Sequence, residues 1–504
     1  MKLLTVQQIK ELEAFTMERQ KITSADLMQR AASKTYNWIK SQLGLDYAYT
    51  VVCGPGNNGG DGLVLAQFLT RNNYDVECVL LDIDYKHTPE YSYELAKLER
   101  SDCKIKTINS ESQLESLNFN GRIVIDAIFG IGLSRAAEGV PGKLIRHINN
   151  SKTVKVIAID LPSGLYCDEL NGPNDPIVHA DYTLTFHVPK TSFFFLEGGN
   201  AIGKIIVLDI RLDKGFASKI EGTHYYITPA MVGSYLKKRT IFTHKGTYGH
   251  ANLIGGSRGK IGAAILMTRA ASLSGTGLTT ATVPSVGFEI MQSSIPVAMC
   301  DDSYGKEQLE GKIEIEDRFT YGVGPGIGTS KETAQFLADF LKKVNMPIVI
   351  DADAINCIAE NPEMLKDIPE NSILTPHVKE FRGLAGATNN SHEQLELLIK
   401  FSVQHKVYIV LKDARTIVCT PGGKCFFSLN GTPGMATGGS GDVLTGLLTG
   451  LLAQGYSPEQ TSKLGLVLHG VAGELASAKH GEYAMTAESI IEEIGNAFKE
   501  LQKN

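Results

Sequence analysis

Two patterns of hydrophobic residues alternate along most of this chain. Short runs rich in Val, Ile, Leu and aromatic residues predict strands, and longer segments with an apolar residue every three or four positions predict helices. In the first half, two helices, at 5–19 and from Thr23 or Ser24, come before the first predicted strand. A glycine turn at 54–62 and a helix at 63–69 follow that strand. The predicted strands cover 47–53, 76–81, 122–126, 155–160, 180–188 and 201–208.

The same alternation resumes after a polar, glycine-bearing stretch at 213–225. The predicted strands there cover 251–254, 275–283, 347–354, 372–380 and 407–411, with a hairpin at 417–420 and 424–428. The predicted helices cover 261–273, 330–344, 458–478 and 487–501. Strands that alternate with helices predict α/β folds with parallel sheets. We therefore predict a Rossmann-like three-layer domain over 1–215 and a second α/β domain over 225–504.

The segment Thr432–Leu452 joins a glycine-rich loop to the start of a helix. Glycines occupy positions 434, 438, 439 and 441, Asp442 follows, and apolar residues recur at helical spacing after it. The unpaired N–H groups at a helix N-terminus favour an anion such as phosphate. A carboxylate would repel that phosphate, so we interpret Asp442 as a base aimed at a neighbouring hydroxyl. The alternative is that Asp442 only caps the helix.

Polar residues also follow three predicted strands of the first half. Asn58 and Asp61 follow the first strand, Asp126 ends the strand at 122–126, and Asp160 ends the strand at 155–160, with Ser163 close behind. The carboxyl ends of adjacent parallel strands line one crevice. We therefore expect these side chains to converge, although any single Asp at a strand end could instead cap a turn or helix.

Composition narrows the classes of function. The 504 residues are 43% hydrophobic and 21% charged with a net charge of −6, and they contain no basic run suited to nucleic acid or a lipid surface. The eight cysteines are scattered, without metal-ligand spacing, as in a reduced cytoplasmic protein. We find neither a signal peptide nor a membrane span. We expect a cytoplasmic homo-oligomer that acts on small molecules, without nucleic-acid or membrane partners.

Six motifs, in order, carry a resemblance that covers nearly the whole chain. Gly54-Pro-Gly-Asn-Asn-Gly-Gly-Asp-Gly and Asp160-Leu-Pro-Ser-Gly resemble the NAD(P)H-hydrate epimerase domain. The second half resembles the ATP- or ADP-dependent NAD(P)H-hydrate dehydratase domain, which has a ribokinase-like fold, through four motifs: Lys245-Gly-Thr-Tyr-Gly-His, Gly322-Val-Gly-Pro-Gly-Ile-Gly, Leu374-Thr-Pro-His-Val-Lys-Glu and Thr437-Gly-Gly-Ser-Gly-Asp. The order is that of the bifunctional NAD(P)H-hydrate repair enzymes.

This resemblance implies two consecutive repairs of a damaged cofactor. Reduced nicotinamide nucleotides hydrate at ring position 6 into R and S epimers. The first domain would interconvert the epimers. The second would dehydrate the S form, using ATP or ADP to phosphorylate the hydroxyl before phosphate leaves, which returns NADH or NADPH.

The resemblance also implies site residues in the first domain. Asp160 would be the acid–base residue and would touch the hydrate, and Asn58, Asp126 and Ser163 would hold K⁺. Hard oxygen ligands by themselves would suit Mg²⁺ as well. Lys190 is a plausible further substrate contact or, alternatively, a surface lysine. The other implied substrate contacts are Asn57, Asn58, Gly59, Gly60, Asp61, Gly130, Ile131, Gly132, Leu133, Ser134, Arg135 and Ala136.

In the second domain Asp442 would be the base. The implied hydrate contacts are Ala263, Gly324, His377 and Asp442, and the implied nucleotide contacts, for ADP or ATP with Mg²⁺, are Lys412, Asp413, Ala414, Arg415, Thr416 and Gly441. The family often has Lys-Gly-x-x-Thr where this chain has Lys412-Asp-Ala-Arg-Thr416, which leaves the nucleotide preference open. His377 alone could equally be a structural histidine. Two alternatives are a ribokinase-like small-molecule kinase fused to a nucleotide-binding module, and a first half that binds without catalysing.

Overall fold

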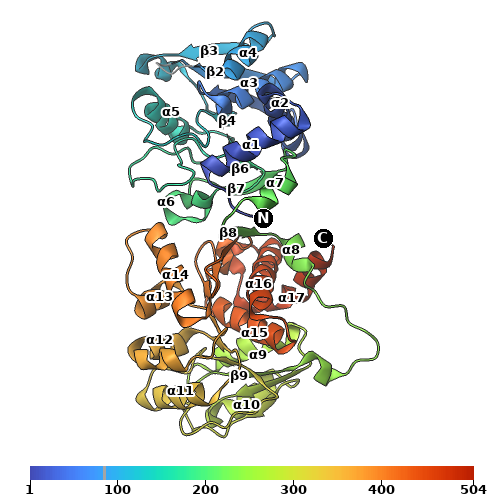
Figure 1. Cartoon of the computed structure of the whole chain (residues 1–504), viewed down its shortest axis with the longest axis vertical. Helices are drawn as coiled ribbons and strands as arrows, with labels where there is room; N and C mark the ends of the chain where they lie inside the picture. Colours follow the sequence, from blue (N-terminus) through green and yellow to red (C-terminus); the bar gives the residue numbers. More distant parts are fainter. Residues whose placement is uncertain (83–86, 504) are drawn as a thin grey trace. The chain divides into compact units, whose positions relative to one another are not determined.

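The computed structural model describes residues 1–82 and 87–503. The chain divides into two compact units, Met1–Gly222 and Thr223–Asn504, which the colours of Figure 1 follow from blue to green and from green to red. Each unit has its own sheet and its own hydrophobic clusters.

A parallel sheet, seven-stranded over the described residues, forms the centre of the first unit. Its order is β3-β2-β1-β4-β5-β6-β7, so the direction of strand addition switches between β1 and β4. Such a switch opens a crevice at the carboxyl ends of the strands. The strands are β1 Ala48–Cys53, β2 Asp75–Leu81, β3 Lys104–Ile108, β4 Ile123–Ala127, β5 Lys155–Ile159, β6 Tyr182–Phe186 and β7 Lys204–Leu208.

Helices cover both faces of this sheet, because successive strand residues are apolar on both sides. Val51 and Cys53 of β1 pack in one cluster with α2 and α3, whereas Val52 packs on the opposite face with α5. The predicted three-layer arrangement is thereby confirmed. The helices of the unit are α1 Val6–Gln20, α2 Ser24–Gln42, α3 Asn57–Arg71, α4 Pro89–Leu98, α5 Gly139–Asn150, α6 Leu196–Gly199 and α7 Lys214–Lys219.

Two sequence predictions for this unit were wrong in detail. The predicted turn at 54–62 is shorter, because α3 begins at Asn57 and includes the later glycines. A Cβ atom at Gly62 would lie 2.6 Å from the Cβ of Ala127, so glycine lets α3 approach the sheet closely. The polar stretch 213–225 contains the boundary between the two units, but it also forms a helix, α7, whose Phe216 ring stacks on that of Phe15 in α1 at 4.3 Å.

The second unit holds a sheet that is ten-stranded over its described residues, in the order β11-β10-β9-β12-β13-β14-β15-β16-β17-β8. The predicted hairpin is confirmed as β16 and β17, which are antiparallel. The first strand of the unit, β8, runs parallel to β17 at the edge and was not predicted. The strands are β8 His224–Ile227, β9 His250–Ile254, β10 Leu278–Thr282, β11 Met299–Asp301, β12 Thr320–Val323, β13 Val349–Ile350, β14 Ile373–Leu374, β15 Tyr408–Leu411, β16 Ile417–Cys419 and β17 Cys425–Ser428.

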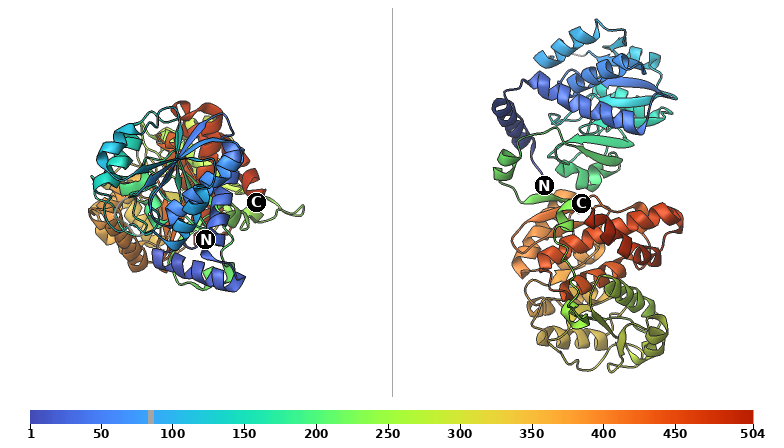
Figure 2. Two further views of the ribbon diagram at one scale, coloured as in Figure 1. Left: turned by 90° about the horizontal axis from the view of Figure 1, so that it is seen from above. Right: turned by 90° about the vertical axis from the view of Figure 1, so that its right-hand side faces the viewer.

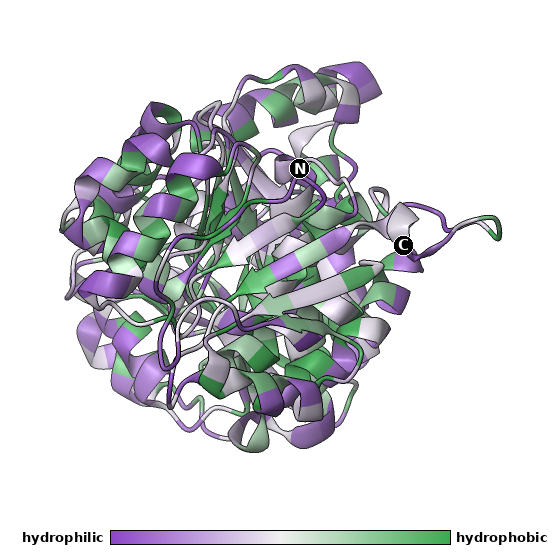
Figure 3. Ribbon diagram, turned by 90° about the horizontal axis from the view of Figure 1, so that it is seen from below, coloured by the Kyte–Doolittle hydropathy of each residue, from purple (hydrophilic) through white to green (hydrophobic). Residues whose placement is uncertain are grey.

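Helices α15, α16 and α17 share one large apolar cluster with β13 to β17. Figure 1 and the right-hand view of Figure 2 show α11 to α14 on the other side of this unit. In Figure 3 the strands are mostly green or white, and purple gathers on the surrounding helices. The helices are α8 Pro229–Gly233, α9 Ile261–Leu273, α10 Phe288–Ser294, α11 Lys331–Lys343, α12 Ala352–Glu360, α13 Val378–Ala385, α14 Ser391–His405, α15 Ser440–Ala453, α16 Pro458–His480 and α17 Ala487–Gln502.

Helix α15 is buried nearly all round, rather than along the single apolar face that its sequence predicts. Its glycines touch α9 directly. A Cβ atom would lie 2.0 Å from the Met267 carbonyl oxygen at Gly446 and 2.0 Å from Ser274 Oγ at Gly450. The two helices therefore meet backbone to backbone, which fixes the position of the N-terminus of α15.

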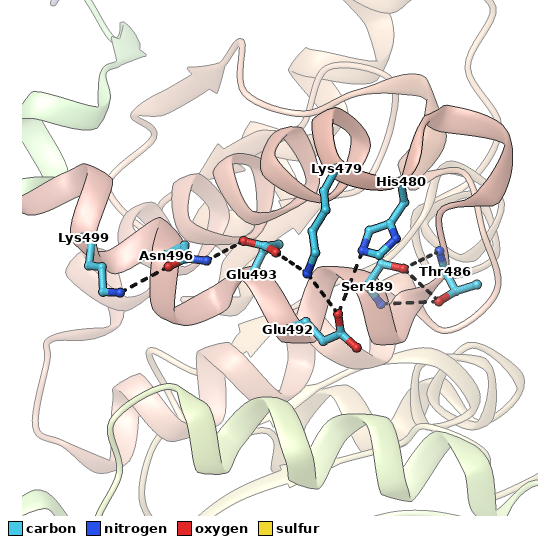
Figure 4. A network of polar contacts seen from close by, with 8 residues as sticks. All are labelled: Lys479, His480, Thr486, Ser489, Glu492, Glu493, Asn496 and Lys499. Carbon is cyan, nitrogen blue, oxygen red and sulfur yellow. Dashed lines mark hydrogen bonds and ion pairs between the residues drawn. The ribbon is translucent and has the colours of Figure 1, made fainter.

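The end of α16 is joined to α17 by polar contacts at the surface (Figure 4). Lys479 Nζ lies 3.1 Å from Glu493 Oε1 and 3.4 Å from Glu492 Oε2. Glu493 also accepts a hydrogen bond of 2.7 Å from Asn496. As predicted, Thr486 caps α17 by accepting from the Ser489 N–H. Exposed ion pairs contribute little, about 0–1 kcal/mol, so the apolar contacts hold these helices together.

Candidate active sites

In the first unit Asp126 and Ser163 meet because β4 and β5 are neighbours in the sheet. Asp126 is fully buried, and its carboxylate accepts hydrogen bonds from Ser163 N at 2.7 Å and from Ser163 Oγ at 2.5 Å. Burial raises the pKa of Asp126 to about 6, and the hydrogen bonds from Ser163 oppose this rise. The pair is thus a preformed group of oxygen atoms at the strand ends.

Asn58 joins this pair through the backbone of Phe129. Asn58 Nδ2 donates to the Phe129 carbonyl at 2.9 Å, and the Phe129 N–H donates to Ser163 Oγ at 2.8 Å. The structure therefore brings the three predicted metal-binding residues together. Their carboxylate, hydroxyl and amide oxygens are the ligands that hard cations prefer, so the donor set fits K⁺.

Asp160 directly follows β5, and its side chain is paired with Lys190. The distance from Lys190 Nζ to Asp160 Oδ1 is 2.7 Å, and the same oxygen accepts from Phe186 N at 3.1 Å and Thr185 Oγ1 at 3.2 Å. Lys190 is only 1% exposed, so the alternative that it is a surface lysine is wrong. Asp160 has a φ of 68°, a left-handed conformation that is strained for a residue with a Cβ atom.

A small cavity of about 20 Å³ opens beside this ion pair. Asp160, Lys190 and His187 line one side of it, and Glu13 of α1 lines another. Asp61 belongs to the same electrostatic group, since both Asp160 and Glu13 raise its pKa after the larger effect of burial. Asp61 and Asp160 were predicted from the sequence, but Glu13 was not, because no recognisable motif surrounds it.

The remaining predicted substrate contacts of the first unit differ in burial and packing. Gly59 and Gly60 are buried in α3, and a Cβ atom at Gly59 would lie 1.7 Å from the Gly54 carbonyl oxygen, so packing already requires glycine there. Asn57 is exposed at the start of α3. The predicted segment 130–136 lies in the connection from β4 to α5, where Ile131 packs with residues of α1.

In the second unit the comparable pair is Asp351 with Lys412. Asp351 follows β13, and its Oδ1 lies 2.6 Å from Lys412 Nζ at the end of β15. Its Oδ2 accepts a hydrogen bond of 2.6 Å from Thr445 of α15. Asp351 is 1% exposed. It was not among the predicted site residues, although its apolar strand ends in Asp as the strands of Asp126 and Asp160 do.

Asp442 stands in the first turn of α15, close to this pair. Burial first, and then the charge of Asp351, raises the pKa of Asp442 to about 7, while Lys412 opposes the rise. The N-cap position is Gly439 with φ 88°, and the described residues place no side-chain cap hydrogen bond on this helix. Asp442 is therefore not the N-cap residue of α15, and its role as the base stays a prediction.

The other predicted hydrate contacts gather at the same strand ends. A Cβ atom at Gly324 would lie 1.8 Å from the Asp351 carbonyl oxygen, so only glycine permits this approach. His377 forms a bridge with Lys412 and caps α13, accepting from the Glu380 N–H at 3.0 Å. Ala263 of α9 is beside Gly326, which belongs to the glycine-rich segment 322–328.

The predicted nucleotide contacts divide into two groups. Gly441 is beside Lys412, because a Cβ atom there would be 3.2 Å from Lys412 Nζ. Arg415 instead donates to the Leu429 carbonyl, Asp413 is exposed, and Thr416 donates to the Asp413 carbonyl at 3.5 Å. The segment from Asp413 to Thr416 thus forms a loop after β15. Lys412, in contrast, contacts the Asp351 carboxylate, which lies close to Asp442.

A larger cavity, of about 460 Å³, lies along the loops that follow β9 and β12. Ser257, Arg258 and Lys306 line it, together with Gly328 of the glycine-rich segment 322–328. The Gly328 N–H donates to Asp353 at 2.9 Å, and Asp353 in turn acts on the pKa of Asp442. Gly328 and Asp353 thus link the lining of this cavity to the charges that act on Asp442.

The fold and these two sites define a class of two-unit α/β proteins with a carboxylate–lysine pair at the strand ends of each unit. A family model described as YjeF-related protein N-terminus matches residues 24–192, and one described as NAD(P)H-hydrate dehydratase matches residues 251–496. The bifunctional NAD(P)H-hydrate repair enzyme Nnr of Moorella thermoacetica is 32% identical over all of this chain and 98% of its own length. The chain belongs to the family of bifunctional NAD(P)H-hydrate repair enzymes.

Further comparisons include a second relative of this name from Thermofilum pendens, which is 30% identical over all of this chain and 97% of its own. A solved ADP/ATP-dependent NAD(P)H-hydrate dehydratase from Bacillus subtilis, co-crystallized with ATP and Mg²⁺, is 26% identical. It covers 55% of this chain and 98% of that chain, with a TM-score of 0.47. No helix among residues 1–82 and 87–503 is long and apolar enough to cross a membrane.

Proposed function

We propose that this chain repairs hydrated NADH and NADPH in two steps, one in each unit. The first unit, predicted at 1–215, interconverts the R and S hydrates. The second, predicted at 225–504, dehydrates the S hydrate with ADP or ATP. Membership of the repair-enzyme family, together with a carboxylate–lysine pair at the strand ends of each unit, carries this proposal.

Epimerisation requires that the configuration at the hydroxyl-bearing carbon be lost and reformed. In the first unit Asp160 exchanges a proton with that hydroxyl, and Lys190 holds the carboxylate in place at 2.7 Å. A carboxyl group that is held in one orientation can transfer a proton over a short distance. The loop 130–136 and the start of α3 contact the rest of the hydrate.

Asn58, Asp126 and Ser163 hold K⁺ in this proposal. A cation there supplies positive charge next to the bound nucleotide. The buried Asp126 carboxylate, whose pKa is raised to about 6, would gain a counter-charge from it.

In the second unit Asp442 removes the proton from the hydroxyl of the S hydrate. The hydroxyl oxygen then forms a bond to the terminal phosphorus of ADP or ATP, while the bond from that phosphorus to the bridging oxygen breaks and AMP or ADP leaves. When the C–O bond breaks, phosphate leaves and a proton departs from the neighbouring ring carbon, which restores the ring double bond. Phosphorylation is needed because hydroxide is a poor leaving group near neutral pH.

The start of α15 and Lys412 bind the nucleotide phosphates. The N–H groups at the N-terminus of α15 favour an anion, and the Lys412 ammonium adds a positive charge beside Gly441. Mg²⁺ enters with the nucleotide and shields its phosphates. The cavity of about 460 Å³ takes a further part of the dinucleotide.

The test is to incubate the full chain with hydrated NADH or NADPH and with ADP or ATP in turn. We expect the near-ultraviolet absorbance of the dihydronicotinamide to return. A small-molecule kinase would instead release a stable phosphate ester without restoring absorbance, and absence of recovery with both nucleotides would refute the dehydratase assignment. We also propose a cytoplasmic homo-oligomer without nucleic-acid or membrane partners, to be checked by fractionation and light scattering.

A further inference from the structure

Glu13 belongs to the first site although it lies in the first helix of the chain, far from the site motifs in sequence. It lines the same cavity as Asp160 and Lys190. Its neighbour Leu12 is fully buried and packs in a cluster that also contacts Ile131 of the predicted substrate loop. Helix α1 therefore forms one wall of this site.

The position of α1 is fixed at both ends. Its first residue, Val6, donates its N–H to Asp168 at 2.8 Å, and Arg19 in its last turn pairs with Asp213 at 2.8 Å. Phe15 stacks on Phe216 of α7, and the right-hand view of Figure 2 shows the dark-blue α1 beside the green α7. A side chain on this helix can thus be held at a defined place in the site.

The titratable groups around Glu13 come from several elements. Asp160 follows β5, Lys190 and His187 follow β6, Asp61 lies on α3, and Lys10 lies on α1 itself. Burial first, and then Asp160, raises the pKa of Glu13 to about 7, against the lowering effects of Lys190 and Lys10. Burial also raises the pKa of Asp61 well above its usual range and lowers that of His187.

This arrangement matches what an epimerisation needs. One group must donate a proton to the departing hydroxyl, and another must accept a proton from the water that adds to the opposite face of the ring. Lys190, Thr185 and the Phe186 N–H hold the Asp160 carboxyl group in place, so we assign Asp160 the role of base. A separate carboxylic acid at the same cavity is required to donate.

We propose that Glu13 is the second proton-transferring residue of the first site and works with Asp160; this rests on the proposed epimerisation. The Glu13 carboxyl donates its proton to the C6 hydroxyl, the C–O bond breaks, water leaves, and the ring nitrogen shares the positive charge at C6. Water then adds from the other face, and its extra proton passes to the Asp160 carboxylate. Solvent returns both carboxyl groups to their starting states, and the reverse epimerisation exchanges their roles.

The experiment compares Glu13→Gln with Glu11→Gln in the full chain. Glu11 is an exposed glutamate of the same helix, hydrogen-bonded to Gln7 at 2.8 Å, and is the matched control. Purified R hydrate is converted without added nucleotide, and the epimers are separated chromatographically. We expect Glu13→Gln to lower the rate of R-to-S conversion by about 10²-fold, the scale of a single acid–base group. Glu11→Gln should match the wild type.

A pH profile separates proton transfer from a structural role. In the wild type, R-to-S conversion should fall as the pH rises through about 7, where Glu13 loses the proton that it must donate. That fall should disappear in Glu13→Gln. Glu13→Asp retains a carboxyl group and should recover part of the rate together with the pH dependence, which guards against a Gln variant that is merely misfolded.

Dehydration of the S hydrate with ADP or ATP serves as the internal standard, because it uses the second unit. If Glu13→Gln converts R hydrate at the wild-type rate, or if Glu13→Asp is no faster than Glu13→Gln, then Glu13 takes no part in proton transfer. If the wild type and Glu11→Gln also fail to convert R hydrate while S hydrate is still dehydrated, the epimerase function itself is wrong.

Discussion

At the scale of single residues, each unit pairs a lysine with a buried aspartate at the carboxyl ends of its strands. Lys190 Nζ is 2.7 Å from Asp160 and Lys412 Nζ is 2.6 Å from Asp351. Next to each pair lies a further carboxyl group, Glu13 or Asp442, whose pKa burial raises to about 7. A carboxyl group with a pKa near the working pH can both take and give a proton, which suits acid–base catalysis.

Removing the lysine of the second pair should be costly. Asp351 is 1% exposed, so Lys412→Met would leave a buried carboxylate with its cation missing. We expect a loss of about 3–5 kcal/mol in the free energy of unfolding, measured by urea denaturation of the second unit. The double variant with Asp351→Asn should recover much of that loss. If the single variant loses less than about 1 kcal/mol, the pair is not electrostatically important.

Asp442→Asn should have different effects on the stability of the protein and on its activity. The folded state keeps a proton on Asp442 up to about pH 7, whereas the unfolded chain loses it near pH 4, so wild-type stability from this group falls as the pH rises between these values. Replacement by the neutral Asn should therefore raise the melting temperature at pH 8 and change it little below pH 4.

The same variant should fail to dehydrate the S hydrate at any pH. Wild-type dehydration should decline as the pH falls below about 7, because the base becomes protonated. A variant that stays active would exclude Asp442 as the base, whatever its effect on stability.

At the scale of elements, the contact between α9 and α15 positions the second site. The N-terminus of α15 carries Gly441 and Asp442, and its glycines touch the backbone of α9. Gly446→Ala should force the helices apart and cost about 1–3 kcal/mol, as overpacking does. The loss should appear as a lower melting temperature, by about 2–4 °C per kcal/mol in a unit of this size.

Gly495→Ala is the matched control, because a Cβ atom at this position of α17 would meet nothing within 4 Å. We expect it to stabilise the second unit by about 0.5–1 kcal/mol through helix propensity. Equal effects of the two alanines would show that the α9–α15 contact does not depend on glycine.

Much of this architecture could be predicted from the sequence, because burial in parallel sheets leaves strong apolar runs. Helix α9 was predicted with the bounds that it has, and the ends of β4 and β5 were expected to bring Asp126 and Ser163 together. The start of α3 was missed because glycines usually end helices, whereas here close packing against Ala127 requires them. Strand β8 was missed because pairing with β17 across the chain, rather than local pattern, makes it a strand.

The site residues that could not be predicted depend on tertiary contacts. Glu13 sits on an amphipathic helix in which nothing distinguishes it from Glu11, and only the packing of Leu12 turns it toward Asp160. Asp351 ends an apolar strand and could have been selected, but its link to Lys412 joins residues 61 positions apart. The position of substrate, nucleotide and K⁺ around these residues stays a prediction.

At the scale of the whole molecule, each proposed site is built within one unit. The residues around Asp160 lie within Met1–Gly222, and those around Asp442 lie within Thr223–Asn504. Neither site needs a side chain of the other unit for the contacts described above. The two activities should therefore be separable by single substitutions in the intact chain.

Mixing two variants tests this independence. Asp160→Asn should still dehydrate S hydrate but leave R hydrate to its slow spontaneous epimerisation, and Asp442→Asn should only epimerise. A mixture of the two proteins with ADP or ATP should restore rapid use of both epimers, because the hydrate can diffuse between molecules. If the mixture is no faster on R hydrate than Asp160→Asn alone, then either the site is not confined to one unit or Asp160 has another role.

Because both units are part of one chain, the ratio of the two repair activities is constrained. Every molecule that is synthesised carries one epimerase site and one dehydratase site, so a cell cannot change their ratio by expressing one more strongly. The balance between R and S hydrate during repair is then set by the two turnover rates and by nucleotide supply. When ADP and ATP are scarce, the first unit continues to equilibrate the epimers, and the damaged pool is held ready for dehydration.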